Sequence, residues 1–274
     1  MKDFRRHRPL NSTTLTHPPV SDLKRAAAST PHLAFWGGAL AAVAVIALFY
    51  FQVAWALLLV TPWYVPIVGS LGALSVGYSL TQRRNWWRIA VALFCAALAC
   101  LEWHFVVAGS ALPAYAGPVA AGVAVPPFRA NLADGSPIDE SYLRENHATA
   151  VVFFQGRWCP FCVTQLRELE ANHAAFDRVA AKVVVVSIED LEAAAETQRD
   201  FPHLVVVSDE QRELSNAMQL INEGMHPDGG DSAAPTILLV DQLGIVRLLH
   251  RPTSFIARPS TSELVSTIEN MIPR

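Results

Sequence analysis

The sequence predicts an α/β domain with a mixed sheet and flanking helices, preceded by about three transmembrane helices. Half of the 274 residues are hydrophobic (52%), which is high for a soluble protein. Long uncharged stretches fill the chain up to about residue 110, whereas charged and apolar residues mix from Pro113 onward. In that second part, short Val-rich runs alternate with helical patterns, as in βαβ units.

The charge divides at the same border. Residues 1–112 carry nine Lys and Arg against three acidic residues, a net charge of +6, and the rest of the chain carries twelve against twenty-one, a net charge of −9. Nucleic-acid binding needs clustered basic residues that neutralise phosphates. An acidic soluble domain therefore excludes nucleic acid as a partner.

Three segments are expected to cross the lipid bilayer. Residues 33–60 contain no charge over 28 positions, more than the roughly 20 that a helix needs to span the hydrocarbon core. A shorter, Gly-rich segment follows at 63–80 and a third at 89–108. A cleaved signal peptide would have a shorter apolar core and no further spans. We expect a transmembrane region over residues 33–110.

The basic residues near the spans predict the orientation. Six lie in the N-terminal tail, residues 1–32, none in the first link, and three in the second link, TQRRNWWR. Because Lys and Arg stay on the cytoplasmic side, the tail is expected inside and, with three spans, the C-terminal domain outside the cytoplasmic (inner) membrane of a bacterium. An even number of spans would reverse this.

The third segment carries four residues with chemistry of their own. Cys95 and Cys100 are five positions apart, about 140° around a helix, so no disulfide is expected between them. Glu102 and His104 fall near the outer interface, where both are expected to reach water. A role in redox relay or quinone contact stays open as the less favoured alternative.

After a Pro-, Gly- and Ala-rich linker, residues 111–127, the domain at 128–274 reads as alternating elements. Continuous Val runs indicate strands covered on both faces, and the last two strands around DQLG indicate an antiparallel hairpin. A closing helix is expected that Ser260 or Thr261 caps. The predicted strands are 150–154, 182–188, 204–207, 236–240 and 245–249, and the predicted helices before the last are 162–180, 190–200 and 209–220.

Two cysteines, Cys159 and Cys162, follow the first of these strands in the stretch FQGRWCPFCVTQL. The helix begins there, with Pro160 in its first turn, where proline is tolerated. Free N–H groups and the helix dipole at a helix N-terminus lower the pKa of a thiol. We expect Cys159 to be the attacking sulfur, with the lower pKa, and Cys162 to resolve the mixed disulfide.

Other uses of the pair are less favoured. A structural disulfide across two residues stabilises little by loop closure, and zinc needs four ligands where the chain offers no second pair. Covalent haem would need histidine at position 163, which is Val163. No cofactor or metal is expected. A copper-delivery module with His226 or His250 as a third ligand stays open as an alternative of another class.

Pro235 begins the stretch APTILLVDQLG, about 70 residues after the pair. A cis peptide bond there would turn the Ala234 backbone toward a substrate. Together these residues resemble the thioredoxin fold, in which WCxxC faces a cis proline. VPPFRANLADGSPI, VVFFQGRWCPFC and VVVVSIEDLEAA further resemble the alkyl hydroperoxide reductase and thiol-specific antioxidant (AhpC/TSA) family of peroxiredoxin-like proteins, over about residues 122–272.

The resemblance implies a thiol oxidoreductase, and two departures shape the expected substrate. Peroxiredoxins resemble one another in a Pro and a Thr or Ser before the reactive cysteine and an Arg near the later strand; this chain has Val152, Gly156 and Ala234 there. We therefore expect reduction of protein disulfides, with hydroperoxides as the alternative substrate and Arg157 as a partial substitute that favours thiolate.

The remaining site residues are expected around the sulfurs. Trp158, Pro160 and Phe161 would shape an apolar surface, and Pro235 with Thr236 would form the opposing wall. Because the outer compartment is oxidising, reductase activity there would need a membrane electron donor.

Overall fold

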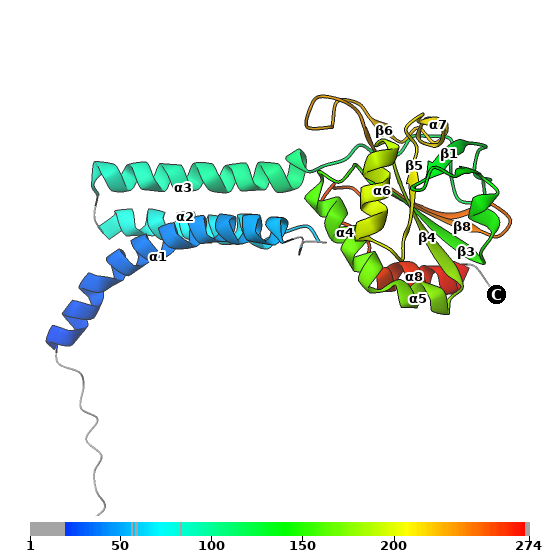
Figure 1. Ribbon diagram of the computed structural model, residues 1–274. Coiled ribbons are helices and arrows are strands. Elements are labelled where there is room, and N and C mark those ends of the chain that lie inside the picture. The colour runs from blue at the N-terminus through cyan, green and yellow to red at the C-terminus, as the bar shows by residue number, and fades with distance from the viewer. Residues whose placement is uncertain (1–19, 56, 58–59, 83, 272–274) are drawn as a thin grey trace, which may run out of the picture. The chain divides into compact units, whose positions relative to one another are not determined.

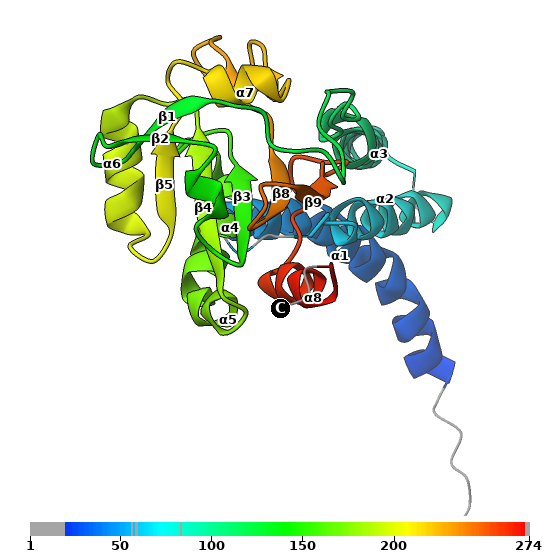
Figure 2. The ribbon, with the colours of Figure 1, turned by 90° about the vertical axis from the view of Figure 1, so that its right-hand side faces the viewer.

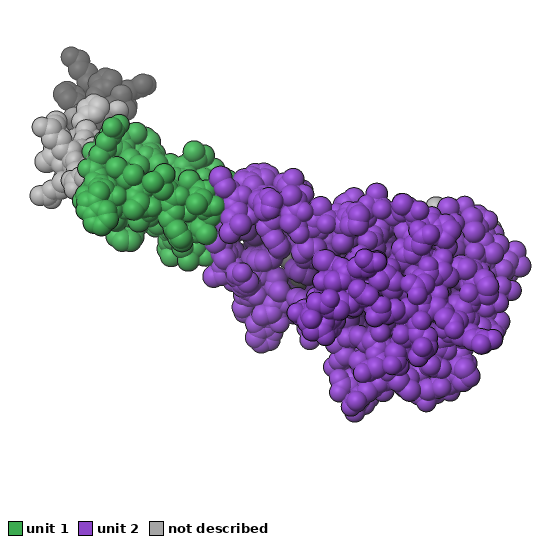
Figure 3. All heavy atoms as spheres, turned by 90° about the horizontal axis from the view of Figure 1, so that it is seen from above, with its two compact units in different colours: residues 1–43, 68–99 green, residues 44–67, 100–274 purple. Residues whose placement is uncertain are grey.

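The computed structural model describes residues 20–271 except 56, 58–59 and 83 (Figure 1). It divides into two compact units, coloured separately in Figure 3. The first comprises the described residues up to Val43 together with Val68–Ala99. The second comprises Ala44–Ile67 together with the chain from Cys100 onward, and it contains the α/β domain.

Three helices are long and apolar enough to cross a membrane, which confirms the predicted number of candidate spans. The first helix ends at Ala54, whereas the predicted span ran to residue 60, because hydrophobicity marks depth in a bilayer and not where a helix stops. Four of the six tail residues that set the predicted orientation (Lys2, Arg5, Arg6 and Arg8) lie outside the described residues. The helices are α1 (Val20–Ala54), α2 (Tyr64–Gln82) and α3 (Trp86–His104), and a π-helical turn, η1 (Phe105–Gly109), extends α3.

In the first unit, α1 and α2 pack closely through glycines. A Cβ atom added at Gly38 would lie 2.6 Å from the Gly72 carbonyl oxygen, and one added at Gly72 would lie 2.6 Å from the Gly38 carbonyl oxygen. Small residues of this kind let membrane helices approach backbone to backbone.

The polar residues of the third span differ from one another. Cys95 is buried, Cys100 is exposed, and both are free thiols, as the helical spacing predicts. Glu102, expected to reach water, is only 8% exposed, and neither carboxylate oxygen has a hydrogen-bond partner. The prediction failed because sequence position gives the depth of a residue along a helix but not the face that neighbouring segments cover.

The second unit contains a seven-stranded mixed sheet in the order β2-β1-β5-β4-β3-β8-β9 (Figure 2). The three Val-rich strands β3, β4 and β5 are parallel, and β8 and β9 form the antiparallel hairpin. All five predicted strands are present within two residues of their predicted ends, and β1, β2 and a small β6–β7 sheet were not predicted. The strands are β1 (Arg129–Leu132), β2 (Pro137–Asp139), β3 (Ala148–Phe153), β4 (Ala181–Ser187), β5 (Val205–Ser208), β6 (Ile221–Asn222), β7 (Ser232–Ala233), β8 (Thr236–Asp241) and β9 (Val246–His250).

Both faces of the sheet are buried, as the continuous Val runs predict. On β3, Val152 packs into the core layer that holds Cys159 and Cys162, while Val151 and Phe153 pack into the opposite layer. The predicted helix 162–180 is two helices that meet at Asn172. The helices of the domain are α4 (Pro160–Ala171), α5 (His173–Arg178), α6 (Leu191–Asp200), α7 (Glu213–Ala217) and α8 (Thr261–Met271), with a 3₁₀ turn, η2 (Tyr142–Arg144).

The segment predicted as a linker packs onto the domain instead. Val119 and Val125 are buried, and the Val125 amide donates to the Gly244 carbonyl at 2.9 Å. Its start is tied down too, because the Leu112 amide donates to the Thr253 carbonyl at 2.9 Å. Pro, Gly and Ala content indicates irregular backbone, but it does not distinguish a free spacer from a segment whose valines are buried.

Candidate functional site

The cysteine pair lies where the central strand β3 leads into α4, as predicted. Cys159 has extended backbone angles, φ −87° and ψ 107°, and is the residue before the first helical position, which Pro160 occupies. The Cys159 carbonyl accepts from the Val163 amide at 3.0 Å, closing the first turn. Cys162 is 0% exposed and Cys159 is 2% exposed, so both sulfurs are enclosed in protein.

Arg258 provides the positive charge at this pair. Its Nη2 lies 3.8 Å from the Cys162 sulfur, and its side chain is only 7% exposed. The Cys159 sulfur lies 3.3 Å from Gln155 Oε1. The pair therefore has a guanidinium on one sulfur and an uncharged amide on the other.

This asymmetry separates the two thiols. Burial raises the pKa of Cys162, but the hydrogen bond from Cys159 and the positive charge of Arg258 outweigh it, so that the pKa is lowered to about 6. The pKa of Cys159 is raised, because its hydrogen bond to Cys162 and its burial both keep the proton on it. The position of Arg258 thus favours the negative charge at Cys162.

The sequence placed the lower pKa at Cys159, whereas the contacts of the two sulfurs in the structure favour the lower pKa at Cys162. The prediction weighed only the helix N-terminus, which both cysteines share within one turn. A charged group brought in by a distant segment decides between them. The cysteine motif does not indicate that Arg258 lies beside it, because Arg258 is 96 positions after Cys162 in the sequence.

The end of the third span holds the loop that carries Arg258. Arg258 Nη1 donates to the carbonyls of Ala257 at 2.9 Å and Ser254 at 3.4 Å. The Ser254 hydroxyl in turn donates to the Ser110 hydroxyl at 3.0 Å, and the Phe255 amide donates to the Ser110 carbonyl at 3.0 Å. The thiolate, its guanidinium and the residue after η1 are thus joined by consecutive contacts.

Aromatic side chains line the same region. The Phe161 ring lies 5.6 Å from the Phe255 ring, which lies 6.2 Å from the Phe105 ring of η1. Trp158 contacts the His226 ring edge to face at 5.4 Å. The structure therefore brings Trp158 and Phe161 to the pair, and Phe161 is itself largely buried.

Pro235 and Thr236 lie at the start of β8, beside the end of β3, where Phe153 pairs with Thr236. The Ala234–Pro235 peptide bond is trans, so the expected cis bond is absent. Arg251 donates to the Thr236 hydroxyl at 3.2 Å and to the Pro235 carbonyl at 3.4 Å. A proline before a strand needs no cis bond, since its fixed φ is compatible with strand entry.

Arg157, beside the pair in sequence, is paired with acidic side chains. Its guanidinium forms ion pairs with Glu196 at 3.3 Å and Asp200 at 3.0 Å on α6, and its backbone amide donates to Glu189 at 3.1 Å. Its charge is directed to these two carboxylates, and the expected effect of Arg157 on the thiolate stays a prediction.

Gly156 permits the turn that leads to the pair. Its φ is +142°, a conformation that residues with side chains rarely adopt. A Cβ atom there would lie 2.7 Å from both Glu189 Oε1 and Trp158 Nε1. The backbone of this chain thus requires glycine at the position where peroxiredoxins carry a hydroxyl.

The copper alternative finds no third ligand near the pair. Among the described residues, no three side chains of His, Cys, Asp or Glu are grouped closely enough to hold a metal ion. His226 contacts Trp158, and His250 lines a pocket on the Arg258 side.

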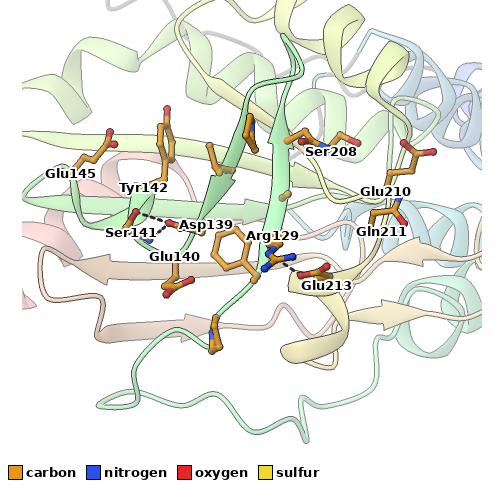
Figure 4. A pocket seen from close by; sticks show the side chains of 16 residues that line it. Arg129, Asp139, Glu140, Ser141, Tyr142, Glu145, Ser208, Glu210, Gln211 and Glu213 are labelled. Carbon is orange, nitrogen blue, oxygen red and sulfur yellow. Dashed lines mark hydrogen bonds between the residues drawn. The ribbon is translucent and has the colours of Figure 1, made fainter.

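A polar pocket of about 900 Å³ lies over β1 and β2 (Figure 4). Asp139, Glu140, Glu145, Glu210 and Glu213 point around it, with Arg129 among them. No cysteine lines it, and β5 and β4 separate its strands from β3 in the sheet. It is not part of the thiol site.

A mixed sheet of thioredoxin type, with a CxxC pair where its central strand meets a helix, defines the class of thioredoxin-fold thiol oxidoreductases. Residues 121–249, just under half of the chain, match the model of the AhpC/TSA family, and this match supports a thiol peroxidase or oxidoreductase. No curated protein matches the chain.

Solved structures agree on the fold. Reduced Prx3 from Vibrio vulnificus in complex with H₂O₂ aligns with a TM-score of 0.50 and 14% identity over 56% of this chain and 100% of that chain. Reduced Prx3 from the same organism aligns with a TM-score of 0.50 and 13% identity over 56% and 99%. Peroxidoxin BcpB from Mycobacterium tuberculosis aligns with a TM-score of 0.49 and 16% identity, over 56% of this chain and 99% of that chain.

Proposed function

We propose that the protein is a membrane-anchored thiol oxidoreductase whose Cys159–Cys162 pair cycles between dithiol and disulfide, and that a small hydroperoxide is the substrate it reduces. The Arg258 guanidinium at 3.8 Å from the Cys162 sulfur carries this proposal. A thiolate, not a thiol, is the nucleophile, and a buried guanidinium stabilises it.

The burial of both sulfurs favours a small substrate. Disulfide exchange needs a partner sulfur in bonding distance of the attacking one, so a folded protein would have to reach a side chain that is 0% exposed. A hydroperoxide needs only a small local opening. Arg258 also supplies the guanidinium whose apparent absence argued against peroxide in the sequence.

The proposed steps balance. The Cys162 thiolate attacks the terminal oxygen of ROOH, the O–O bond breaks, and RO⁻ leaves and takes a proton to become ROH. Cys162 is then a sulfenic acid. The Cys159 thiol attacks its sulfur and releases water, forming the Cys159–Cys162 disulfide. An external dithiol or a membrane electron donor returns two electrons to the pair by exchange.

Protein disulfides, the substrate that the sequence favoured, are the second candidate. The observation in favour is the CxxC pair at a helix N-terminus with Trp158 half-exposed beside it. The buried sulfurs count against it.

The anchor and its orientation belong to the proposal. Three apolar helices of sufficient length support an anchor in the bacterial inner membrane. The basic residues flanking the predicted spans support a redox domain on the periplasmic side.

The test compares hydrogen peroxide with insulin as oxidant, using the full chain in detergent with dithiothreitol and with Cys95 and Cys100 replaced by serine. We expect faster peroxide consumption, lost in Cys162→Ser. In Cys159→Ser, a sulfenic acid on Cys162 should accumulate and react with dimedone. Faster insulin reduction would favour the second candidate, and a sulfenic acid found in Cys162→Ser would reverse the assigned roles.

A further inference from the structure

A second pocket of about 700 Å³ is lined by residues of β9, the loop after it, which includes Arg258, and α8. All of its lining residues belong to the second unit. One of its walls is the loop after β9, which is hydrogen-bonded through Ser254 to Ser110, the residue after η1. Its lining comprises Val60, Thr61, Trp63, Leu248, His250, Arg251, Pro252, Thr253, Ala257, Arg258, Pro259, Glu263, Leu264 and Thr267.

The pocket carries an excess of positive charge. Arg251 and Arg258 both line it, and they are close enough for the charge of Arg258 to lower the pKa of Arg251, after the larger effect of burial. Within the described part of the chain, neither guanidinium forms an ion pair with a carboxylate. Glu263, the acidic residue of the lining, is occupied in capping α8, where its Oε2 accepts from the Ser260 amide at 2.7 Å.

Each of the two guanidinium groups leaves one buried donor unused. Arg251 uses its Nη atoms for Pro235, Thr236 and Asn222, and Arg258 uses its Nη atoms for Ser254, Ala257 and Cys162. The Nε atoms of both arginines are buried without a partner. Since buried charged donors are almost always satisfied, these two N–H groups point to an acceptor from outside the chain.

We infer that this pocket binds an oxyanion, a phosphate or a carboxylate, at the guanidinium groups of Arg251 and Arg258. Guanidinium groups match such oxygens in shape and charge. Val60, Trp63, Leu248 and Leu264 give the same pocket an apolar wall, which suits an oxyanion carried on a hydrocarbon chain. The inference does not depend on the substrate of the cysteine pair.

Binding is tested by calorimetric titration of the full chain in an uncharged maltoside detergent. Inorganic phosphate supplies the free oxyanion, dodecyl phosphate supplies the same group on an apolar chain, and dodecanol supplies the chain alone. Arg251→Gln removes one guanidinium from the pocket. Arg199→Gln, at an exposed position on α6, is the matched control for loss of one positive charge.

We expect Arg251→Gln to weaken phosphate or dodecyl phosphate binding by about 10- to 100-fold, the usual loss for a charge-assisted hydrogen bond, and Arg199→Gln to leave it unchanged. Tighter binding of dodecyl phosphate than of phosphate, without binding of dodecanol, assigns the site to an amphiphile, and equal binding assigns it to a free oxyanion.

No binding of either phosphate, or binding that Arg251→Gln leaves intact, overturns the inference. If Arg251→Gln fails to fold, Arg251→Lys keeps the charge but not the fork, and it should weaken binding by a smaller factor. Equal binding by Arg251→Lys and the parent protein would then overturn the inference as well.

Discussion

Replacing Arg258 by methionine tests the electrostatic basis of the thiol site. Methionine keeps much of the length and apolar contact of the side chain but removes the guanidinium, 3.8 Å from the Cys162 sulfur. Burial then still raises the pKa of Cys162. Only the hydrogen bonds from the Cys159 thiol and from the backbone of Gln155 remain to lower this pKa. The pKa should move from about 6 back toward the ordinary 9.0.

The magnitude follows from the two pKa values. At pH 7, a thiol of pKa 6 is about 90% ionised and one of pKa 9 about 1%, so the thiolate population should fall by about 10- to 90-fold. Reactions that need the thiolate should therefore rise with pH through about 6 in the parent protein and at distinctly higher pH in Arg258→Met.

The assay is a pH titration of thiolate ultraviolet absorbance, which does not require a reagent to reach the buried sulfur. The full chain is used with Cys95 and Cys100 replaced by serine, and Arg199→Met serves as the charge control. Arg258→Lys should give an intermediate pKa. If Arg258→Met titrates like the parent protein, the guanidinium does not hold the thiolate and the reasoning is refuted.

Three further predictions concern the fold and the membrane. Gly156→Ala should lower the free energy of unfolding by about 1–3 kcal/mol in thermal or denaturant unfolding, since its Cβ would meet Glu189 and Trp158 at a φ of +142°; an unchanged midpoint would contradict the strain. Leu169→Ala should lower the free energy of unfolding by about 2–5 kcal/mol in the same measurement, because this fully buried side chain of α4 fills the core layer that holds the cysteines. A loss below about 1 kcal/mol, roughly that of an exposed site, would show that this layer is loosely packed. A reporter active only in the periplasm and fused after Arg274 should be active, and activity of a cytoplasmic reporter there instead would reverse the proposed orientation.

The parts of the fold that sequence reasoning predicted are those governed by local pattern. Val runs such as residues 182–188 identified β4 because a strand buried on both faces needs no polar alternation. Ser260 and Glu263 form the cap of α8 because a capping residue acts on the turn that follows it. The position of Cys159 and Cys162 at the start of α4 was predicted from local pattern too, because a strand pattern precedes them and Pro160 marks the first helical turn.

The parts that it missed depend on contacts between distant segments. Arg258 is an ordinary arginine in sequence, and only the packing of the loop after β9 brings it to Cys162. Arg157 stands beside the pair in sequence, yet the acidic face of α6 binds it. Closeness in sequence did not predict which arginine lies near the Cys162 sulfur, because the folded structure decides which charged side chains surround it.

The contact between Ser254 and Ser110 has a practical consequence for biochemistry on this protein. A fragment cut at the apparent border of the soluble part, after residue 112, would keep both cysteines and Arg258 but lose the serine and the backbone carbonyl that hold residues 254 and 255. In the fragment, the loop that carries Arg258 would lack its hydrogen bonds to Ser110, so the position of the guanidinium beside Cys162 would be less well fixed. A reduction potential measured on such a fragment would describe the fragment, and the native value requires the third helix to be left in place.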